Sequence, residues 1–308
     1  MTGDQHIAVI GAGLMGHGIA LTFARAGHAV AITDPVAEML HSAPARIAES
    51  LTLLGADQGE IDAALARITL SPSTQATVAD AQVVFEAAPE KLALKQAIFA
   101  EVEAHAPPDA ILASNTSVIQ ISKIMGGLST RHRALGTHWW NPPHMIPLVE
   151  VVKTEWTNPA LAQSMFDLLA RAGKTPAMVE KDVPGFIGNR LQHALWREAI
   201  SLVENGICDA ETVDNVVKAS FGRRLAVLGP LENADLVGLE LTQDIHAQVL
   251  FDLDTSGTPS PYLQKMRDQG RHGMAAGAGL RDWSAGDLEK TKARVAEHLR
   301  QLTAILPN

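Results

Sequence analysis

Apolar and β-branched residues occur in short runs over the first part of the chain, separated by longer stretches of helical periodicity. The stretches 92–105 and 161–172, for example, place apolar residues at helical spacing. This alternation predicts β-α-β units, with a mostly parallel sheet covered by helices on both faces. The apolar runs predict strands at residues 6–11, 29–34, 82–87, 111–114, 134–139, 147–152 and 175–180.

The pattern changes after Pro184 and Gly185, where helical periodicity becomes nearly continuous. We therefore expect an α/β fold in two parts, a Rossmann-type domain over residues 1–184 and an all-helical domain over residues 185–308. The segment 252–282 is rich in Gly, Pro and Ser and is predicted to be a surface loop or lid. Helices of the second domain are predicted at residues 186–204, 209–220, 231–250 and 287–306.

Composition narrows the classes of function. The 308 residues carry a formal net charge of −9, which disfavours binding to nucleic acid. No apolar run approaches the ~20 residues of a membrane-spanning helix, so we expect no membrane partner. A single cysteine, Cys208, excludes an intrachain disulfide and is expected to be a half-buried helix residue. The first residues lack the features of a secretion signal or transit peptide, which predicts a cytoplasmic location.

A glycine-rich segment follows the first predicted strand and leads directly into a helical stretch. Its glycines, Gly11, Gly13 and Gly16, enclose Leu14 and Met15 in a GxGxxG pattern. Glycines at these positions permit a tight turn and let a pyrophosphate approach the backbone at a helix N-terminus. The segment therefore predicts a dinucleotide-binding site rather than a purely structural turn.

Asp34 ends the second predicted strand, 18 residues after Gly16, where a ribose-binding acid is expected. A carboxylate accepts a hydrogen bond from a ribose 2′-hydroxyl but repels a 2′-phosphate. Pro35 and Val36 follow Asp34, and no arginine is close in the sequence. NAD is therefore predicted as the cofactor in preference to NADP.

Reactive residues are expected at the carboxyl edge of the sheet, where open α/β folds bind ligands. His138 ends a predicted strand there, and a histidine is suited to accept the proton of a hydroxyl group at neutral pH. Glu150, flanked by apolar residues, is a candidate to orient the ring and stabilise its charged form. From the residues alone, Glu150 is equally well interpreted as an acid on an edge strand that faces water.

These segments together carry a family resemblance. GAGLMG with Asp34, FEAAPE with Lys95, SNTS, GTHWWNP, PLVEVV and PGFIGNRLQ occur in this order along the chain. In this combination they resemble the 3-hydroxyacyl-CoA dehydrogenase superfamily over almost the whole chain. The resemblance implies an NAD-dependent enzyme that oxidises a CH–OH group, with His138 as the catalytic base and Glu150 as its partner.

The resemblance also implies roles for residues outside the His–Glu pair. The serine of SNTS and the asparagine of PGFIGNR, Ser117 and Asn189, would contact the reacting oxygen. Contacts to the nicotinamide or ribose would come from Glu90, Lys95, Ser117 and Asn141.

Three further candidates, Trp139, Trp140 and His144, follow His138 in GTHWWNPPHM. His144 follows the pair of prolines and is expected to line a cleft or face water, because the segment lacks the additional ligands that a metal site requires. We predict no metal. Of Trp139 and Trp140, one is expected to pack in the core at the strand end, and the other to form a wall of the substrate pocket.

The sequence departs from the coenzyme A enzymes in ways that bear on the substrate. In those enzymes, lysines after the second strand help to hold phosphate groups, whereas segment 49–60 here has three acids and no lysine or arginine. NPPHMIPLVE looks closer to relatives that oxidise free hydroxy acids, such as the L-gulonate 3-dehydrogenase (lambda-crystallin) group and the pyridine-carboxylate dehydrogenases. Arg190, Arg223 and Arg224 are candidates to bind a small carboxylate, or alternatively are surface arginines.

The leading hypothesis is an NAD-dependent dehydrogenase of a small hydroxylated carboxylate, such as a 3-hydroxy acid, a sugar acid or an aromatic hydroxymethyl acid. A 3-hydroxyacyl-CoA dehydrogenase is the first alternative, and a non-catalytic NAD-binding structural protein is the second. Segments 225–231 and 236–241 are poor in charge, so we expect a homodimer that associates through the helical domain.

Overall fold

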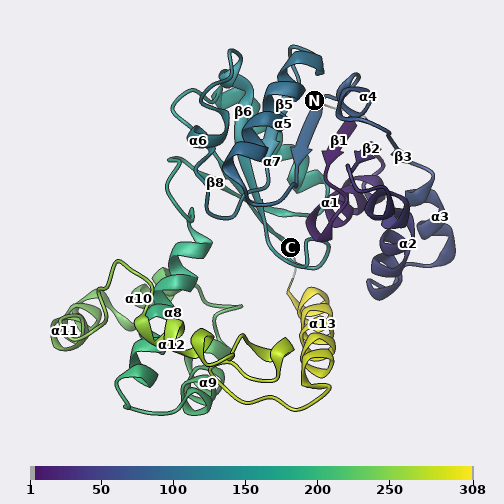
Figure 1. Cartoon of the computed structure of the whole chain (residues 1–308). Coiled ribbons are helices and arrows are strands. Elements are labelled where there is room, and N and C mark those ends of the chain that lie inside the picture. The colour runs from purple at the N-terminus through teal and green to yellow at the C-terminus, as the bar shows by residue number, and fades with distance from the viewer. Residues whose placement is uncertain (1–3, 307–308) are drawn as a thin grey trace. The chain divides into compact units, whose positions relative to one another are not determined.

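The computed structural model describes residues 4–306, which divide into two compact units, residues 4–190 and 191–306 (Figure 1). The first unit thus includes residues 185–190, which the sequence pattern assigned to the helical domain. Among the described residues, no helix is both long enough and apolar enough to cross a membrane.

The first unit is built on one eight-stranded sheet of order β3-β2-β1-β4-β5-β6-β7-β8. All neighbouring strands are parallel except β6 and β7, which run antiparallel. The prediction of a mostly parallel sheet is confirmed. The strands are β1 (His6–Ile10), β2 (Ala29–Thr33), β3 (Ile68–Leu70), β4 (Val83–Glu86), β5 (Ile111–Ser114), β6 (Ala134–Trp139), β7 (Leu148–Val152) and β8 (Thr175–Val179).

One strand, β3, was not predicted. It has three residues, none of them fully buried, and it pairs only with β2. A run this short at a sheet edge shows no periodicity, so its pairing depends on contacts with β2 rather than on its own pattern.

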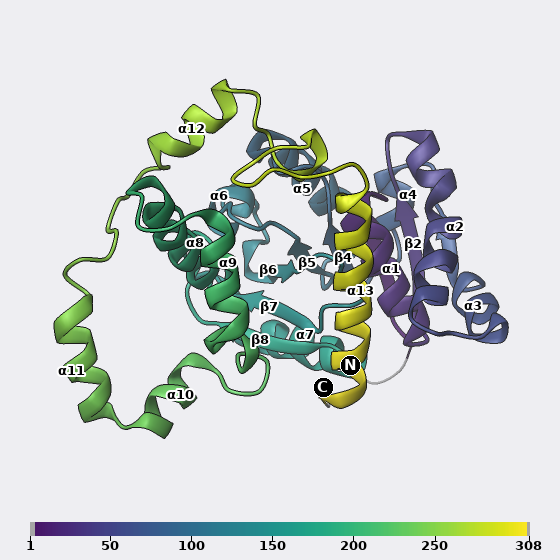
Figure 2. The same cartoon turned by 90° about the horizontal axis from the view of Figure 1, so that it is seen from below.

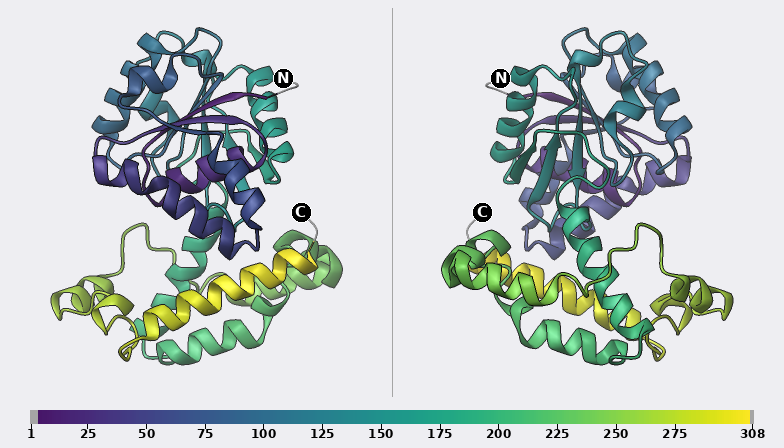
Figure 3. Two further views of the ribbon diagram at one scale, coloured as in Figure 1. Left: turned by 90° about the vertical axis from the view of Figure 1, so that its right-hand side faces the viewer. Right: turned by 90° about the vertical axis from the view of Figure 1, so that its left-hand side faces the viewer.

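Helices cover both faces of this sheet, as Figure 3 shows. Alternate strand residues point to opposite faces, so Val83 and Phe85 pack with α1, α2 and α7, whereas Val84 packs with α5 and α6. This two-sided burial explains the continuous apolar runs of the strands. The helices of the unit are α1 (Leu14–Arg25), α2 (Ala37–Leu53), α3 (Gln58–Leu65), α4 (Thr74–Val78), α5 (Leu92–His105), α6 (Ile121–Met125), η1 (Arg131–Arg133) and α7 (Pro159–Arg171).

The second unit consists of helices and connecting segments, apart from isolated β-bridges at residues 273–282. None of these helices contains a fully buried residue among those described, and α10 and α11 extend away from α8 and α9 (Figure 2). The helices are α8 (Gly188–Glu204, which starts in the first unit), α9 (Ala210–Ala219), η2 (Phe221–Arg223), α10 (Pro230–Val237), α11 (Leu239–Val249), α12 (Pro261–Asp268), η3 (Met274–Ala276) and α13 (Asp287–Ile305).

Three predictions about this unit need correction. The helix expected over 231–250 is interrupted at Gly238, whose φ of 94° is incompatible with a continuous helix. The segment expected as a loop, 252–282, contains α12, which Ser260 caps through its hydroxyl and Pro261 begins. Cys208 is half-buried as expected, but it lies in the turn between α8 and α9 and not in a helix.

Candidate active site

His138 and Glu150 face each other across the antiparallel pair β6 and β7. The Nδ1 atom of His138 lies 2.6 Å from Oε2 of Glu150, and the two residues are only 3% and 1% exposed. β7 lies between β6 and β8, so the interpretation of Glu150 as an edge-strand acid facing water is wrong. The hairpin register places these two side chains opposite each other on the same face of the sheet.

The second oxygen of Glu150 is also held. Oε1 accepts hydrogen bonds from the backbone N–H groups of Ile187 at 2.8 Å and Gly188 at 3.0 Å. Phe186, just before them, is buried and has a φ of 49°, which non-glycine residues rarely adopt. This backbone conformation turns the two N–H groups at the start of α8 toward the carboxylate.

Burial and hydrogen bonding act in opposite directions on Glu150. Burial raises the pKa of its carboxyl group, but the hydrogen bonds from His138, Gly188 and Ile187 together outweigh burial. The net result is a pKa below the usual range, so the carboxylate is ionised at neutral pH. An ionised Glu150 accepts a hydrogen bond from Nδ1–H of His138, and in the neutral ring this tautomer has its lone pair on Nε2.

Nε2 of His138 makes no hydrogen bond to any residue between 4 and 306, whereas its ring is packed on two sides. Trp140 lies 5.2 Å and Phe186 5.6 Å away, measured between ring centroids. The ring orientation is therefore set by Glu150 and by aromatic packing. The arrangement therefore provides one oriented proton acceptor, Nε2 of His138.

Ser117 and Asn189 meet although they are far apart in the chain. The side-chain amide of Asn189 donates to the Ser117 carbonyl at 2.8 Å, and the Ser117 N–H donates to Oε1 of Glu90 at 3.1 Å. The Thr116 hydroxyl also donates to the same Glu90 oxygen. The structure thus brings three predicted site residues, Glu90, Ser117 and Asn189, into one hydrogen-bonded chain beyond the end of β5.

Lys95 is completely buried, and its ammonium group is committed to protein atoms. It donates to both carboxylate oxygens of Glu86, at 2.7 and 3.0 Å, and lies 3.5 Å from Glu90. Ser114 donates to the same Glu86 carboxylate at 2.6 Å. The contact predicted between Lys95 and the cofactor stays a prediction, and what Lys95 does in the structure is to hold Glu86 and Glu90.

Two residues that organise this edge of the sheet were not predicted from the sequence. Glu86 ends β4 and is fully buried. Burial raises the pKa of its carboxyl group, and the charge of Lys95 and the hydrogen bonds lower the pKa by less. Asn115 follows β5, and its side-chain oxygen accepts the Trp139 N–H at 3.1 Å. The available signal was a polar residue at the carboxyl end of a buried strand, as its last residue for Glu86 and as the next residue for Asn115.

The two tryptophans separate into core and site. Trp139 is buried against Phe23 and Phe85, whereas Trp140 lies beside His138 and against Gly188. A Cβ at Gly188 would come within 2.4 Å of the Trp140 ring, so glycine is required for this contact.

The glycine loop has the shape of a phosphate cradle. Gly11 has a φ of 100°, and a Cβ at Gly16 would come within 1.7 Å of the Gly11 carbonyl oxygen, so both positions require glycine. A Cβ at Gly13 would meet no protein atom within 4 Å, so the space above it is open. Asp34 accepts the Ala12 N–H at 2.8 Å and remains half-exposed beside this space. These residues fit a bound dinucleotide.

The remaining candidates form no side-chain hydrogen bond with His138, Glu150, Ser117 or Asn189 within residues 4–306. Asn141 and Arg190 are exposed, and Arg190 makes only a 3.5 Å contact with the Pro184 carbonyl. Arg223 and Arg224 are exposed residues of the second unit. His144 is half-buried, its ring centroid is 6.1 Å from that of His17 on α1, and burial is the main cause that lowers its pKa to about 4.

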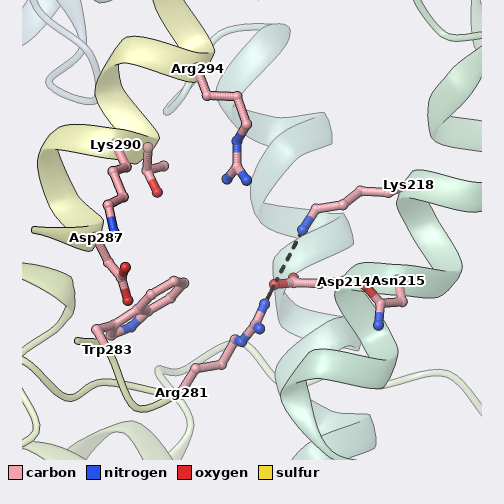
Figure 4. Close-up of a pocket in the computed structure, with 9 residues that line it drawn as sticks. Asp214, Asn215, Lys218, Arg281, Trp283, Asp287, Lys290 and Arg294 are labelled. Atoms are coloured by element: carbon pink, nitrogen blue, oxygen red, sulfur yellow. Dashed lines mark hydrogen bonds and ion pairs between the residues drawn. The ribbon is translucent and has the colours of Figure 1, made fainter.

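The second unit has a cavity of its own, of about 630 Å³, between α9, α13 and residues 281–283 (Figure 4). Arg281 is held by Asp214 at 2.8 Å and by Glu211 at 3.2 Å. Lys290 and Arg294, one turn apart on α13, form no ion pair with any other described residue. None of the predicted site residues lines this cavity.

Comparison with known proteins identifies both parts of the chain. Residues 6–183 match the family model for the NAD-binding domain of 3-hydroxyacyl-CoA dehydrogenase, and residues 185–283 match the model for its C-terminal domain. A similar curated protein is 5-formyl-3-hydroxy-2-methylpyridine 4-carboxylate 5-dehydrogenase from Mesorhizobium japonicum. It is 33% identical over 302 residues, which cover 98% of this chain and 97% of the relative.

A crystal structure described as that dehydrogenase, "an NAD+ dependent dismutase", superposes with a TM-score of 0.87. It is 32% identical and covers 98% of this chain and 97% of its own. A relative from Homo sapiens, the mitochondrial hydroxyacyl-coenzyme A dehydrogenase, is 34% identical over 288 residues, or 90% of each chain. The similarity to both kinds of relative extends over nearly the whole chain.

Proposed function

The chain belongs to the 3-hydroxyacyl-CoA dehydrogenase family and is an NAD-dependent dehydrogenase acting on CH–OH groups, and from this premise we propose that it oxidises a small hydroxylated carboxylate. The observation that carries the catalytic part of the proposal is the buried His138–Glu150 pair, 2.6 Å apart, with Nε2 of the histidine free to accept a proton.

Oxidation of the hydroxyl group requires loss of a proton from oxygen and of a hydride from carbon. In the proposed mechanism, Nε2 of His138 takes the proton as the C–H bond breaks and the C=O bond forms. NAD, when bound, supplies the hydride acceptor. The imidazolium that forms is stabilised by the Glu150 carboxylate, which is held ionised by Ile187 and Gly188.

Ser117 and Asn189 are proposed to position the reacting oxygen. The Asn189 amide donates one N–H to the Ser117 carbonyl. Its second N–H and its carbonyl oxygen are available to a ligand, and Ser117 is an exposed residue. Trp140, packed on His138, is proposed as a wall of the substrate pocket.

The carboxylate substrate class rests on two observations. A relative that matches 98% of this chain is named for a pyridine carboxylate. Residues 49–60, which run from the end of α2 into α3, contain three acids and no lysine or arginine to hold a phosphorylated carrier. Arg190, whose guanidinium is exposed, is the proposed carboxylate ligand in the first unit.

The competing function is oxidation of an acyl-CoA substrate. The name of the human relative, a hydroxyacyl-coenzyme A dehydrogenase, supports this alternative. NADH formation by the purified protein should be compared across CoA-linked 3-hydroxy acids, free 3-hydroxy acids, sugar acids and aromatic hydroxymethyl acids. We expect kcat/KM to be highest for a free acid. A higher value for 3-hydroxybutyryl-CoA would reject the proposed substrate class, and no turnover of any substrate would favour a non-catalytic NAD-binding protein.

We further propose that two copies associate through the second unit. Its helices contain no fully buried residue among those described, and α11 exposes apolar side chains such as Leu241 and Ile245. Residues 225–264 carry six acids and no lysine or arginine. This charge complements Lys290 and Arg294 at the cavity, which form no ion pair with another residue of 4–306. A second copy can therefore bury apolar surface and neutralise charge. The cytoplasmic location stays a prediction.

A further inference from the structure

The peptide group between Ala12 and Gly13 is held by an arginine from a distant helix. Arg46, on the third turn of α2, donates from Nη2 to the Ala12 carbonyl at 2.7 Å. The same nitrogen donates to the Met39 carbonyl at 2.8 Å, and Nε lies 3.3 Å from the Ser42 hydroxyl. The guanidinium is thus anchored at the start of α2 while it holds the glycine loop.

Both the backbone and the ring of His17 contact the next peptide group, between Gly13 and Leu14. The Gly13 carbonyl accepts the backbone N–H of His17 at 3.1 Å, at the start of α1. Nδ1 of His17 lies 3.0 Å from the Gly13 carbonyl oxygen, and Nε2 lies 3.4 Å from the Ser50 hydroxyl. Burial is the largest cause that lowers the pKa of His17, and the nearby Arg46 charge lowers it further. In the neutral tautomer with its proton on Nδ1, the ring donates to Gly13 and accepts from Ser50. Nη1 of Arg46, 3.4 Å from Nδ1, then lies beside the ring without donating to it.

In a trans peptide the C=O and the N–H of one unit point in opposite directions. A carbonyl of Ala12 directed at Arg46 therefore directs the Gly13 N–H the other way, and a carbonyl of Gly13 directed at His17 does the same for the Leu14 N–H. These two N–H groups donate to no atom of residues 4–306, and the space above Gly13 is open.

We propose that Arg46 and His17 are positioning residues that aim the Gly13 and Leu14 N–H groups at the pyrophosphate of NAD. Neither side chain needs to touch the dinucleotide, because each acts through one carbonyl of the loop. Their contribution is pre-organisation, so it should affect ligands that carry the pyrophosphate and spare those that lack it.

The test is direct binding measured by calorimetry on the full-length protein. In Arg46→Met, we expect the Kd values of NAD and of ADP-ribose to rise about tenfold, which is the loss of roughly one charged hydrogen bond. The Kd of adenosine, measured by competition, should change less than about twofold. His17→Leu should act in the same direction with a smaller effect, because the backbone N–H of residue 17 still donates to the Gly13 carbonyl. Arg46→Lys should recover part of the affinity. In turnover, KM for NAD should rise while kcat at saturation stays within about twofold.

Arg67→Met is the matched control, because Arg67 also donates to a helix carbonyl, that of Ala63, but is exposed and remote from the glycine loop. It should bind NAD as the wild type does. NAD affinity unchanged in Arg46→Met would overturn the proposal. So would an equal loss for adenosine and ADP-ribose, since that result would indicate general loosening of the unit. If Arg46→Met does not fold, Arg46→Lys and His17→Leu test the proposal by the same comparison, the Kd values of NAD and ADP-ribose against that of adenosine.

Discussion

The Glu150 carboxylate accepts three hydrogen bonds, from the His138 ring and from the backbone N–H groups of Ile187 and Gly188. Together they keep the carboxylate ionised although it is almost fully buried. An equally buried acid without such hydrogen bonds would tend to be protonated. At the scale of single residues, the proposed chemistry therefore depends on a supported carboxylate as much as on the histidine.

Replacing the base should separate chemistry from cofactor binding. In His138→Gln we expect turnover to fall about a hundredfold or more, because no side chain accepts the hydroxyl proton. NAD affinity should remain close to that of the wild type, since the glycine loop lies on other elements. Steady-state rates and calorimetric NAD titration measure the two effects. Unchanged turnover would remove His138 from the mechanism.

Glu150→Gln tests the ionisation of the carboxylate through stability. The folded-state pKa of Glu150 lies below its usual value of 4.5, so ionised Glu150 stabilises the folded state above that pH, and the stabilisation is lost as the pH falls through the folded-state value. Urea unfolding at pH 7 should show Glu150→Gln to be less stable than the wild type. The difference should shrink steadily in the acid range below 4.5. A difference that is independent of pH would contradict this assignment.

At the scale of elements, the junction of β1 with α1 contains glycines that are required for different reasons. Gly16 is needed for packing, because a Cβ there would lie 1.7 Å from the Gly11 carbonyl oxygen. Gly13 has an ordinary φ of −66° and open space around it, so the fold itself does not require glycine there. The requirement at Gly13 comes from the ligand that approaches the loop.

A pair of alanine substitutions should separate these two requirements. Gly16→Ala should destabilise the protein by about 3 kcal/mol, because the helix must move away from the strand. Gly13→Ala should leave the melting temperature unchanged and weaken NAD binding at least about tenfold. Thermal unfolding and NAD titration of both variants distinguish them, with Gly127→Ala, another open position, as the control. Wild-type NAD affinity in Gly13→Ala would argue against a pyrophosphate above this residue.

At the scale of the whole molecule, the two units differ in how they bury apolar residues. The first unit buries side chains on both faces of its sheet, whereas the helices of the second leave large apolar residues exposed. A helical unit without a buried core is not expected to be stable alone, which is the physical basis for the proposed association of two copies.

Charge placed on α11 should disrupt that association. Leu241 and Ile245 are 51% and 52% exposed and lie one turn apart. In the double variant Leu241→Asp with Ile245→Asp, light scattering should report the mass of a single chain and the melting temperature should fall. Leu53→Asp, at a comparably exposed site on α2 of the first unit, should leave the mass unchanged. A double variant that keeps the mass of two chains would place the interface elsewhere.

Residues that carry their signal locally could be identified from sequence. The strand runs and the glycine pattern depend on neighbours within one element, and the confirmed sheet follows from them. The edge strand β3 was not predicted because it depends on pairing with β2 and has little pattern of its own. The break at Gly238 was not predicted because it depends on a positive φ at one residue. Cys208 was predicted in a helix, but α8 ends at Glu204, and Gly206 with its φ of 69° lies between the helix end and the cysteine.

By itself, then, the amino-acid sequence determined the α/β fold, NAD as the cofactor and the class of reaction, because each rests on short-range patterns and on motifs in a definite order. Only the tertiary structure decided that Glu150 is buried against His138, that Glu86 holds Lys95, and that Arg46 reaches the Ala12 carbonyl from 34 residues away. These contacts join residues on different elements, so they exist only once the strands have paired and the helices have packed against the sheet.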